Sequence, residues 1–391
     1  MGSDVPGPGP DFEPGPAELR IDLDAIAANW RLLQARAGKA RCAAVVKADA
    51  YGLSAARVAP ALWAAGCRSF FVAHGAEGLS LRQCLPNAEI FVLHGLSDQL
   101  AAFAAAGLVP VLNSLDEIAA WSARAGAAGR PLPAALHIDT GMTRLGLSEA
   151  SVARLAAEPE RLANLSLRLV MSHLACADDP AHPMNREQLD AFARLKRALP
   201  PLPASLSSSG GIFQGAPFHF EMVRPGIALY GGRPLASAPN PMAEAVRLAA
   251  KVLQVHDVDT PRTVGYGATR QVSGGTRIAT IGVGYADGYF RSLGNRGFAC
   301  IDGIPVPVVG RVSMDLITLD VTALPATRVG AGTRVDLIGG GVDVDALADA
   351  AGTLAYEILT RLGPRYRRVY VGAAAGEGQD PAPCAGAVSS G

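Results

Sequence analysis

Eight short apolar runs alternate with helical stretches in this chain, and this alternation constrains the fold more than any other feature. The runs are 42–46, 69–73, 89–94, 108–113, 134–139, 167–173, 204–207 and 222–229. Stretches rich in alanine and leucine separate them, for example 97–106, 114–125, 149–157 and 185–199. Near-continuous apolar strands that alternate with helices are typical of a parallel sheet. Eight such units therefore predict a (β/α)8 barrel.

An open, doubly wound sheet is the alternative fold for the same alternation. Such a sheet usually carries phosphate-binding glycines of the GxGxxG type in its first turn. Here the first apolar run is followed by residues 47–52, with the sequence KADAYG, which is not that motif. Before this run, 18–23 alternates like a strand, and 24–35 has helical spacing with Asp24 as its expected cap. A helix is expected over 52–65.

The pattern changes near residue 243, and a mainly-β second domain is predicted from there. Alternating runs at 252–258, 277–283, 298–301, 306–312, 316–321 and 334–337 are separated by turn residues. One helix over 344–362 is expected to close this domain. The predicted boundaries are a disordered leader (1–16), the barrel (17–242), the β-rich domain (243–372) and a disordered tail (373–391). We leave open whether the strand at 18–23 packs on the second domain.

Composition excludes several classes of function. The net charge is zero, whereas binding to nucleic acid or to an anionic membrane surface needs a basic excess. The six cysteines form no CxxC pair, which favours reduced thiols in a cytoplasmic protein. The leader is rich in proline, glycine and acid, unlike a signal peptide, and no apolar run reaches the roughly 18–20 residues of a membrane span.

Reactive residue types follow the carboxyl ends of the predicted barrel strands, where barrel enzymes place their active sites. They are Lys47, Arg144, His173, Ser209 and Arg224. Each has an ordinary alternative when it is taken alone. The lysine can reach solvent, the histidine can be satisfied in the core, the arginine can pair on the surface and the Ser/Gly segment at 207–211 can be a plain turn. Their joint placement favours a site.

Two of these features together indicate a cofactor. Barrels commonly bind phosphate in their last two units, which here contain the Ser/Gly segment and Arg224-Pro225-Gly226. A lysine buried at a strand end has a depressed pKa and becomes a nucleophile able to form a Schiff base. A reactive lysine and a phosphate site suggest pyridoxal phosphate. No metal site is expected, because the seven histidines are scattered without an HxH or HExxH motif.

Several motifs, read together, resemble those of the alanine racemase family. They are the segments 45–52, 137–146, 222–231, 264–269, 282–288 and 309–315, and the similarity extends from about residue 19 to residue 370. The resemblance implies a pyridoxal phosphate-dependent enzyme that interconverts L- and D-alanine and supplies D-alanine for peptidoglycan. It also implies a homodimer in which each active site is shared between subunits.

The resemblance assigns a role to each candidate residue. Lys47 would carry the cofactor and act as one base, and Tyr266 would be the base on the opposite face of the substrate. Arg224 would face the pyridine nitrogen, His173 would lie beside the ring, and Arg144 would meet the phenolic oxygen and the substrate carboxylate. The residues implied at the phosphate are Tyr51, Ser209, Gly226 and Ile227, and those implied at the substrate entrance are Tyr285 and Met314.

The chain departs from the family pattern at a few positions. His137 stands where many members carry a carbamylated lysine, so either this histidine or a bound anion would orient Arg144, and no carbamate is expected. Arg361 stands where a tyrosine often contacts the phosphate, and Ser208-Ser209 replaces the usual Asn-Ser. A broader-specificity amino-acid racemase and a non-catalytic pyridoxal phosphate carrier are the alternative functions. The carrier usually lacks a β-rich domain.

Overall fold

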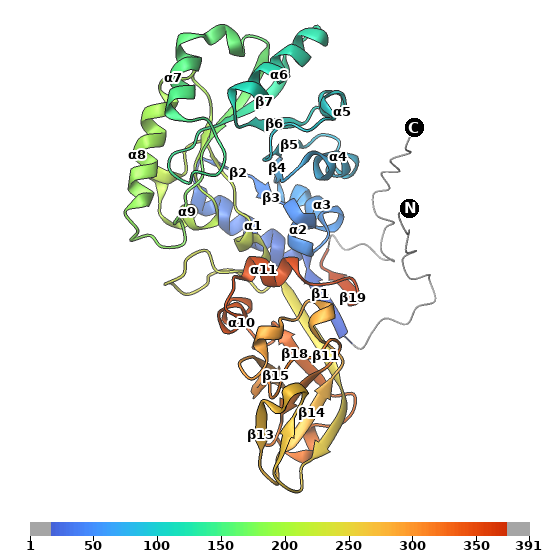
Figure 1. Ribbon diagram of the computed structural model, residues 1–391. Coiled ribbons are helices and arrows are strands. Elements are labelled where there is room, and N and C mark those ends of the chain that lie inside the picture. The colour runs from blue at the N-terminus through green and yellow to red at the C-terminus, as the bar shows by residue number, and fades with distance from the viewer. Residues whose placement is uncertain (1–16, 374–391) are drawn as a thin grey trace. The chain divides into compact units, whose positions relative to one another are not determined.

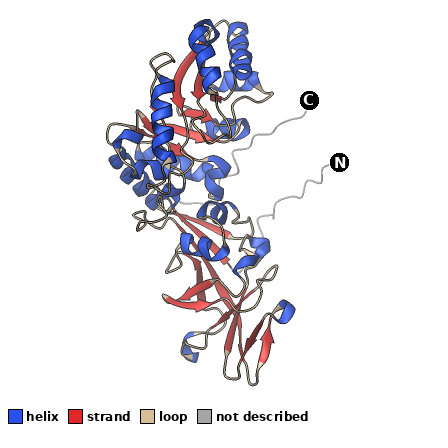
Figure 2. Cartoon of the chain, turned by 60° about the vertical axis from the view of Figure 1, so that its left-hand side comes forward, coloured by secondary structure: helices blue, strands red, loops and turns tan. Residues whose placement is uncertain are grey.

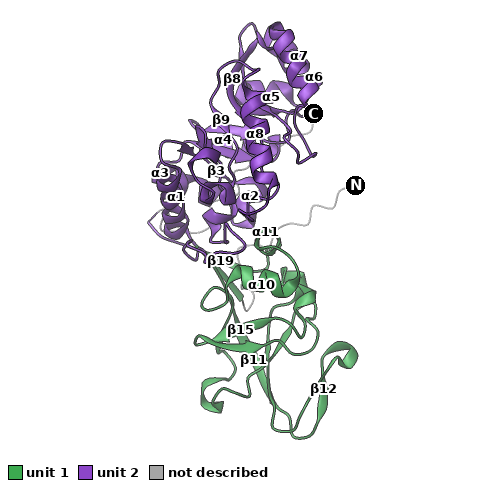
Figure 3. Ribbon diagram, turned by 90° about the vertical axis from the view of Figure 1, so that its left-hand side faces the viewer, with its two compact units in different colours: residues 1–21, 246–370 green, residues 22–245, 371–391 purple. Residues whose placement is uncertain are grey.

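A computed structural model describes residues 17–373, and the chain divides into two compact units (Figure 3). One unit contains residues 22–245 and the short segment from 371, and the other contains the chain up to residue 21 and residues 246–370. The expected leader and all but the first residue of the expected tail lie outside the described residues. No helix within 17–373 is long and apolar enough to cross a membrane.

The larger unit is a (β/α)8 barrel, as predicted. Seven parallel strands follow one another in chain order: β3 (Ala44–Val45), β4 (Ser69–Val72), β5 (Glu89–Val92), β6 (Val109–Leu112), β7 (Leu132–His137), β8 (Leu165–Met171) and β9 (Ala204–Ser205). The eighth position is filled by β10 (Met222–Val223), which pairs in parallel with β2 (Arg41–Cys42).

Backbone hydrogen bonds on both sides of β10 close the barrel. Arg224 N–H donates to the Ser207 carbonyl at 2.9 Å, which joins the segment to the end of β9. On the other side, Ala43 N–H donates to the Val223 carbonyl at 2.9 Å, and Val45 N–H to the Pro225 carbonyl at 3.0 Å. The first apolar run therefore forms two short strands with different partners: β2 pairs with β10, and β3 pairs with β4.

Helices surround these strands (Figures 1 and 2). They are α1 (Leu23–Ala37), α3 (Ala55–Ala65), α4 (Gly75–Cys84), α5 (Leu100–Ala106), α6 (Leu115–Ala127), α7 (Glu149–Ala157) and α8 (Met184–Lys196). The expected Asp24 cap is wrong, because Asp22 is the N-cap and its Oδ1 accepts Ala25 N–H at 2.9 Å. The helix expected over 52–65 starts only at Ala55, since Lys47–Gly52 forms a separate turn.

The other unit is mainly β. Its main sheet has the order β16-β15-β18-β11-β1-β19, and β14 and β17 extend it from β11. These strands are β1 (Ala17–Asp22), β11 (Val246–Asp257), β14 (Arg277–Ile281), β15 (Phe298–Ile301), β16 (Ile304–Pro307), β17 (Ile317–Asp320), β18 (Arg334–Ile338) and β19 (Arg367–Val371). The first strand, β1, pairs antiparallel with β11 from Ala17 to Ile21.

Two features of this unit were not expected from the sequence. The hairpin of β12 (Arg262–Val264) and β13 (Arg270–Val272) carries the short helix η4 (Tyr266–Ala268) at its turn. The single helix expected over 344–362 is wrong, because it is divided into α10 (Val344–Ala351) and α11 (Ala355–Thr360). Gly352 ends α10 in the left-handed region with φ 75°, where glycine has no steric penalty.

Candidate active site

The barrel brings together the charged residues expected at its strand ends. Lys47 follows β3, Arg144 follows β7, His173 follows β8 and Arg224 follows β10. Burial and then the charge of Arg144 lower the pKa of Lys47. Burial followed by Arg224, Arg144, His137 and Lys47 lowers the pKa of His173 to about 3. These mutual effects indicate that the five side chains share one region of the barrel.

An unusual backbone turn presents Lys47. Four consecutive non-glycine residues, 48–51, have φ between 52° and 58°, so the chain makes a left-handed turn directly after the lysine. Glu77 of α4 holds this turn, since its Oε1 accepts Ala48 N–H at 2.7 Å and its Oε2 accepts Ala73 N–H at 2.7 Å. The Glu77 carboxylate thus joins the end of β4 to the lysine turn, and its charge partly opposes the lowering of the Lys47 pKa.

Arg224 is held deep in the barrel by neutral groups. Its side chain is buried, with one terminal nitrogen bonded to Ser205 Oγ and the other donating to the Ser172 carbonyl at 2.6 Å. The second nitrogen also lies 3.4 Å from His173 Nδ1. Burial lowers the pKa of Arg224 to about 9, so the guanidinium still carries its charge at neutral pH.

Asn113 fixes the orientation of His137. The Asn113 amide nitrogen donates to the Val111 carbonyl at 2.8 Å, so its Oδ1 faces His137 Nδ1, also at 2.8 Å. Because an amide oxygen only accepts, His137 Nδ1 carries the proton and Nε2 keeps its lone pair. Burial and the charge of Arg224 lower the pKa of His137 to about 4. A neutral His137 is therefore available as a hydrogen-bond acceptor at Nε2.

The last two barrel units form a cradle of backbone and hydroxyl groups. Ser209 Oγ accepts hydrogen bonds from Gly226 N–H at 3.0 Å and Ala228 N–H at 3.3 Å. A Cβ on Gly226 would lie 2.2 Å from the Tyr51 hydroxyl, so only glycine permits this approach. Ile227, which is buried, starts the short helix η3 (Ile227–Tyr230) beside these groups. The cradle therefore contains each residue that the resemblance implies at the phosphate.

The other predicted residues belong to the β-rich unit, where their side chains are exposed. Tyr266 lies at the turn of the β12–β13 hairpin and is 73% exposed. Tyr285, on the short helix η5 (Tyr285–Asp287), is 43% exposed, and Met314 is 54% exposed. Arg361 follows α11, and one of its terminal nitrogens lies 3.8 Å from the carboxylate of Glu357 on that helix. Its role at a phosphate stays a prediction.

Residues that position the site were missed by the sequence reasoning. Asn113 follows the carboxyl end of β6, so the rule that identified Lys47 could also have identified it. Glu77 and Ser205 act through hydrogen bonds to backbone amides and to Arg224, and the sequence carries no motif for such contacts.

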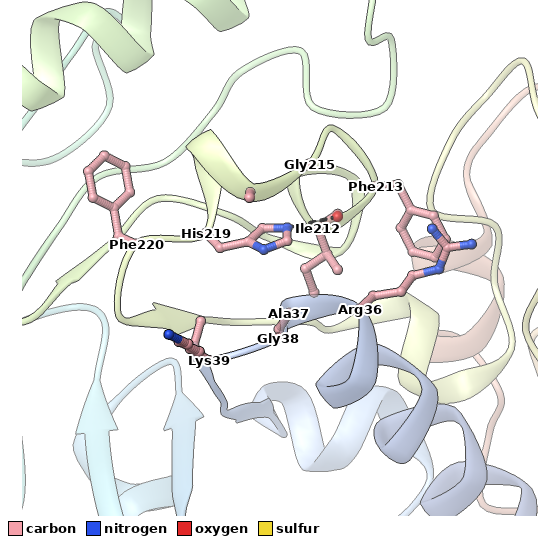
Figure 4. A pocket seen from close by; sticks show the side chains of 11 residues that line it. Arg36, Ala37, Gly38, Lys39, Ile212, Phe213, Gly215, His219 and Phe220 are labelled. Atoms are coloured by element: carbon pink, nitrogen blue, oxygen red, sulfur yellow. Dashed lines mark hydrogen bonds between the residues drawn. The ribbon is translucent and has the colours of Figure 1, made fainter.

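A separate pocket lies at the other end of the barrel (Figure 4). It is formed by residues 36–40, before β2, and by 212–220, before β10. His219 is oriented there by Nε2, which donates to the Ile212 carbonyl at 2.9 Å. Because these segments precede the strands, the pocket is at the amino ends of β2 and β10 and not at the end that carries Lys47. It contains none of the predicted site residues.

Comparisons with known proteins agree with the division of the chain into two units. Residues 21–234 match the alanine racemase N-terminal domain, and residues 245–370 match the alanine racemase C-terminal domain. An alanine racemase of Rhodospirillum rubrum is 52% identical over 369 residues, which is 93% of this chain and 98% of that protein. A catabolic alanine racemase of Agrobacterium fabrum is 50% identical over 90% of this chain and 92% of its own length.

Solved structures give the same result. The alanine racemase of Bartonella henselae with covalently bound pyridoxal phosphate superposes with a TM-score of 0.88 at 40% identity, covering 92% of this chain and 100% of that one. The biosynthetic alanine racemase of Pseudomonas aeruginosa gives a TM-score of 0.84 at 34% identity, covering 91% and 99%. The domain matches, the identity over nearly the whole length and the common fold lead to one conclusion: this chain belongs to the alanine racemase family.

Proposed function

We propose that this protein interconverts L- and D-alanine and uses pyridoxal phosphate as its cofactor. The observation that carries the proposal is the half-buried amine of Lys47, whose pKa is lowered by burial and by Arg144, which favours the neutral, nucleophilic form. The same barrel carries the Ser209 and Gly226 groups proposed to hold a phosphate. The family gives the reaction, and we infer that the barrel supplies the cofactor site and one of the two bases.

The residues of the barrel fit this cofactor. Lys47, Arg144 and Arg224 are cationic or can become so, and they lie near enough to affect one another or His173 electrostatically. Such a site favours an anionic ligand. Lys47 would hold the cofactor covalently through its amine, and Arg224 would meet the ring nitrogen. The hydroxyl and amide groups proposed for the phosphate belong to Tyr51, Ser209, Gly226 and Ile227.

Racemisation needs one proton-transfer group on each face of the substrate. When bound, pyridoxal phosphate withdraws electrons from the α-carbon of the amino acid and so acidifies its α-proton. Lys47 would move a proton at its amine on one face. The Tyr266 hydroxyl would do so on the other, and its exposure in its own unit leaves it open to a second molecule. Arg144 would hold the substrate carboxylate, with Tyr285 and Met314 at the entrance.

Arg224 would direct the chemistry toward racemisation. A guanidinium that keeps its proton does not give it to the ring nitrogen. The ring then withdraws electrons less strongly than one paired with an acid. Return of the proton to the α-carbon is thereby favoured over side reactions.

The proposed assembly is a homodimer with shared active sites, in which Tyr266 serves the Lys47 of the partner subunit. Several large apolar side chains of the β-rich unit are exposed, which supports an interface there: Tyr266, Tyr285, Met314, Leu354 and Tyr356. Mixing inactive Lys47→Ala and Tyr266→Phe proteins, after exchange of subunits, should restore activity by forming one intact site. A mixture that stays inactive after proven exchange would contradict the shared site.

The reaction and both bases are tested with the purified protein. A racemisation screen over L- and D-amino acids should single out alanine, whereas equal rates for larger substrates would favour a broader-specificity racemase. Borohydride should fix pyridoxal phosphate to Lys47. Binding of the cofactor without any racemisation would favour a carrier protein.

Tyr266→Phe provides the test of the two-base scheme. It should slow removal of the α-proton from L-alanine far more than from D-alanine, since each enantiomer presents its proton to one base. The rate at which each enantiomer, labelled with deuterium at the α-carbon, loses its label to solvent measures this directly. Equal effects on both would refute the scheme.

The proposed physiological role is supply of D-alanine for peptidoglycan from the cytoplasm. No disulfide joins the five cysteines within 17–373, which suits a reducing compartment. Expression of the protein should rescue growth of a bacterial D-alanine auxotroph. Failure of an active, expressed enzyme to do so would favour a role in alanine breakdown.

A further inference from the structure

Arg365 joins two loops of the β-rich unit. Its Nε lies 3.0 Å from Asp287 Oδ1, and one terminal nitrogen lies 2.8 Å from Asp315 Oδ1. Asp287 is the last residue of η5, which begins at Tyr285, and Asp315 directly follows Met314. One guanidinium therefore bridges the two loops that carry the proposed entrance residues. Planar guanidinium groups suit such bridging because their donors have fixed directions.

The two loops are also in direct backbone contact. Tyr285 N–H donates to the Ser313 carbonyl at 3.0 Å, and Ala286 N–H donates to the Met314 carbonyl at 3.0 Å. A Cβ on Gly284 would lie 2.2 Å from the Met314 carbonyl oxygen, so the approach is closer than a side chain permits. The positions of Tyr285 and Met314 are therefore coupled.

Asp287 anchors this arrangement. Its carboxylate is buried, and Oδ2 accepts Gly284 N–H at 2.9 Å while Oδ1 meets Arg365. The Asp287 carbonyl accepts Gly363 N–H at 3.0 Å, which holds the segment before Arg365 against the same turn. A buried carboxylate that loses its cation is costly. Removing Arg365 should therefore loosen the turn that presents Tyr285.

We propose that Arg365 is a positioning residue for the substrate: by bridging Asp287 and Asp315 it fixes the positions of Tyr285 and Met314, the proposed entrance residues, relative to each other. The inference rests on the proposed function, which places those two residues at the entrance for alanine. Arg365 itself does not touch the substrate. Its loss changes where the substrate is held and leaves the proton-transfer groups in place.

The test compares Arg365→Met with Arg367→Met. Arg367 is a matched control, since it is 56% exposed against 51% for Arg365 and pairs with a carboxylate, Glu18, in the same unit. Arg365→Met should raise KM for both alanine enantiomers about tenfold with kcat changed by less than about threefold, because small misplacements weaken binding. Arg365→Lys should raise KM less than Arg365→Met does, since lysine keeps the positive charge but cannot bridge two carboxylates with a planar group. Arg367→Met should behave as wild type.

Hydrogen exchange supplies a readout that does not depend on activity. The amides of Tyr285 and Ala286 should exchange faster in Arg365→Met than in Arg367→Met. Unchanged exchange, or an equal change in both variants, would overturn the bridge. Faster exchange with unchanged KM would overturn the substrate role of Arg365 alone, whereas a wild-type protein that does not racemise alanine would overturn the proposed function. A lower kcat together with a higher KM and weaker cofactor binding, none of them restored in Arg365→Lys, would show that Arg365 has only a structural role.

Discussion

Replacing Glu77 with glutamine should both destabilise the barrel and change the reactivity of Lys47. The four left-handed residues after Lys47 cost about 1–2 kcal/mol each, or roughly 4–8 kcal/mol together. Glu77 offsets part of this cost with two hydrogen bonds of 2.7 Å from a side chain that is only 19% exposed. Hydrogen bonds to charged groups contribute about 1.5–3 kcal/mol each.

Glutamine keeps one acceptor and turns its NH2 group toward the second backbone N–H. The variant should therefore lose one bond and weaken the other, which costs about 3 kcal/mol. For a domain of this size, that corresponds to a fall of roughly 6–12 °C in Tm. Since the Glu77 charge raises the pKa of Lys47, its removal should lower that pKa further. The neutral amine would then persist to lower pH.

The assay uses cofactor-free protein. Thermal unfolding measures stability, and absorbance follows the rate at which Lys47 captures pyridoxal phosphate across a pH series. The rising limb of this profile should move to lower pH in Glu77→Gln. Glu221→Gln is the control, because Glu221 Oε2 also accepts a strand-end amide, Ala204 N–H at 2.7 Å, but lies before β10. Equal losses of stability with identical pH profiles in the two variants would refute the reasoning.

Two further predictions concern the cofactor cradle and the histidines. Gly226→Ala should weaken pyridoxal phosphate binding more than about tenfold, because its Cβ would lie 2.2 Å from the Tyr51 hydroxyl, whereas Gly126→Ala, with open space at its Cβ, should bind as wild type in an absorbance titration. The pKa values of His137 and His173 are about 4 and about 3, below the ordinary 6.5, so the unfolded chain binds more protons as pH falls below 6.5. From pH 6.5 to 5, each histidine should cost about 2 kcal/mol of unfolding free energy in urea titrations of cofactor-free protein, and His173→Leu should remove about half of the joint loss. An unchanged pH dependence in that variant would contradict the assignment.

The barrel could be predicted because parallel strands that are buried on both faces consist of nearly continuous apolar residues. The limits of the runs were less informative. The last predicted run, 222–229, yields a strand of only two residues, and Ile227–Tyr230 is a short helix that is apolar because it is buried. An apolar run reports burial, and a short one does not distinguish a strand from a buried helical turn.

The left-handed turn after Lys47 could not be predicted. Alanine, aspartate and tyrosine have no preference for positive φ of the kind that glycine has. The conformation is imposed by tertiary contacts, with Glu77 holding Ala48 and the Asp49 carboxylate accepting Ala55 N–H at 2.7 Å. The ion pairs of Arg365 could not be predicted for the same reason, because its partners Asp287 and Asp315 are far away in the sequence and adjacent only in the fold.

Charge interactions in the barrel site couple the pKa values of residues that the sequence identifies only individually. Arg144 lowers the pKa of both Lys47 and His173, and Arg224 lowers that of both His137 and His173. Burial is the largest cause of each shift, and the arginine contributions are repulsions between positive charges that an anion placed among them would reduce together. Binding of the cofactor and activation of Lys47 are therefore opposed in part, because the phenolic oxygen proposed to meet Arg144 would also raise the pKa of the lysine. A covalent bond from Lys47 to the cofactor resolves this opposition, since a lysine that is already bonded needs no further activation.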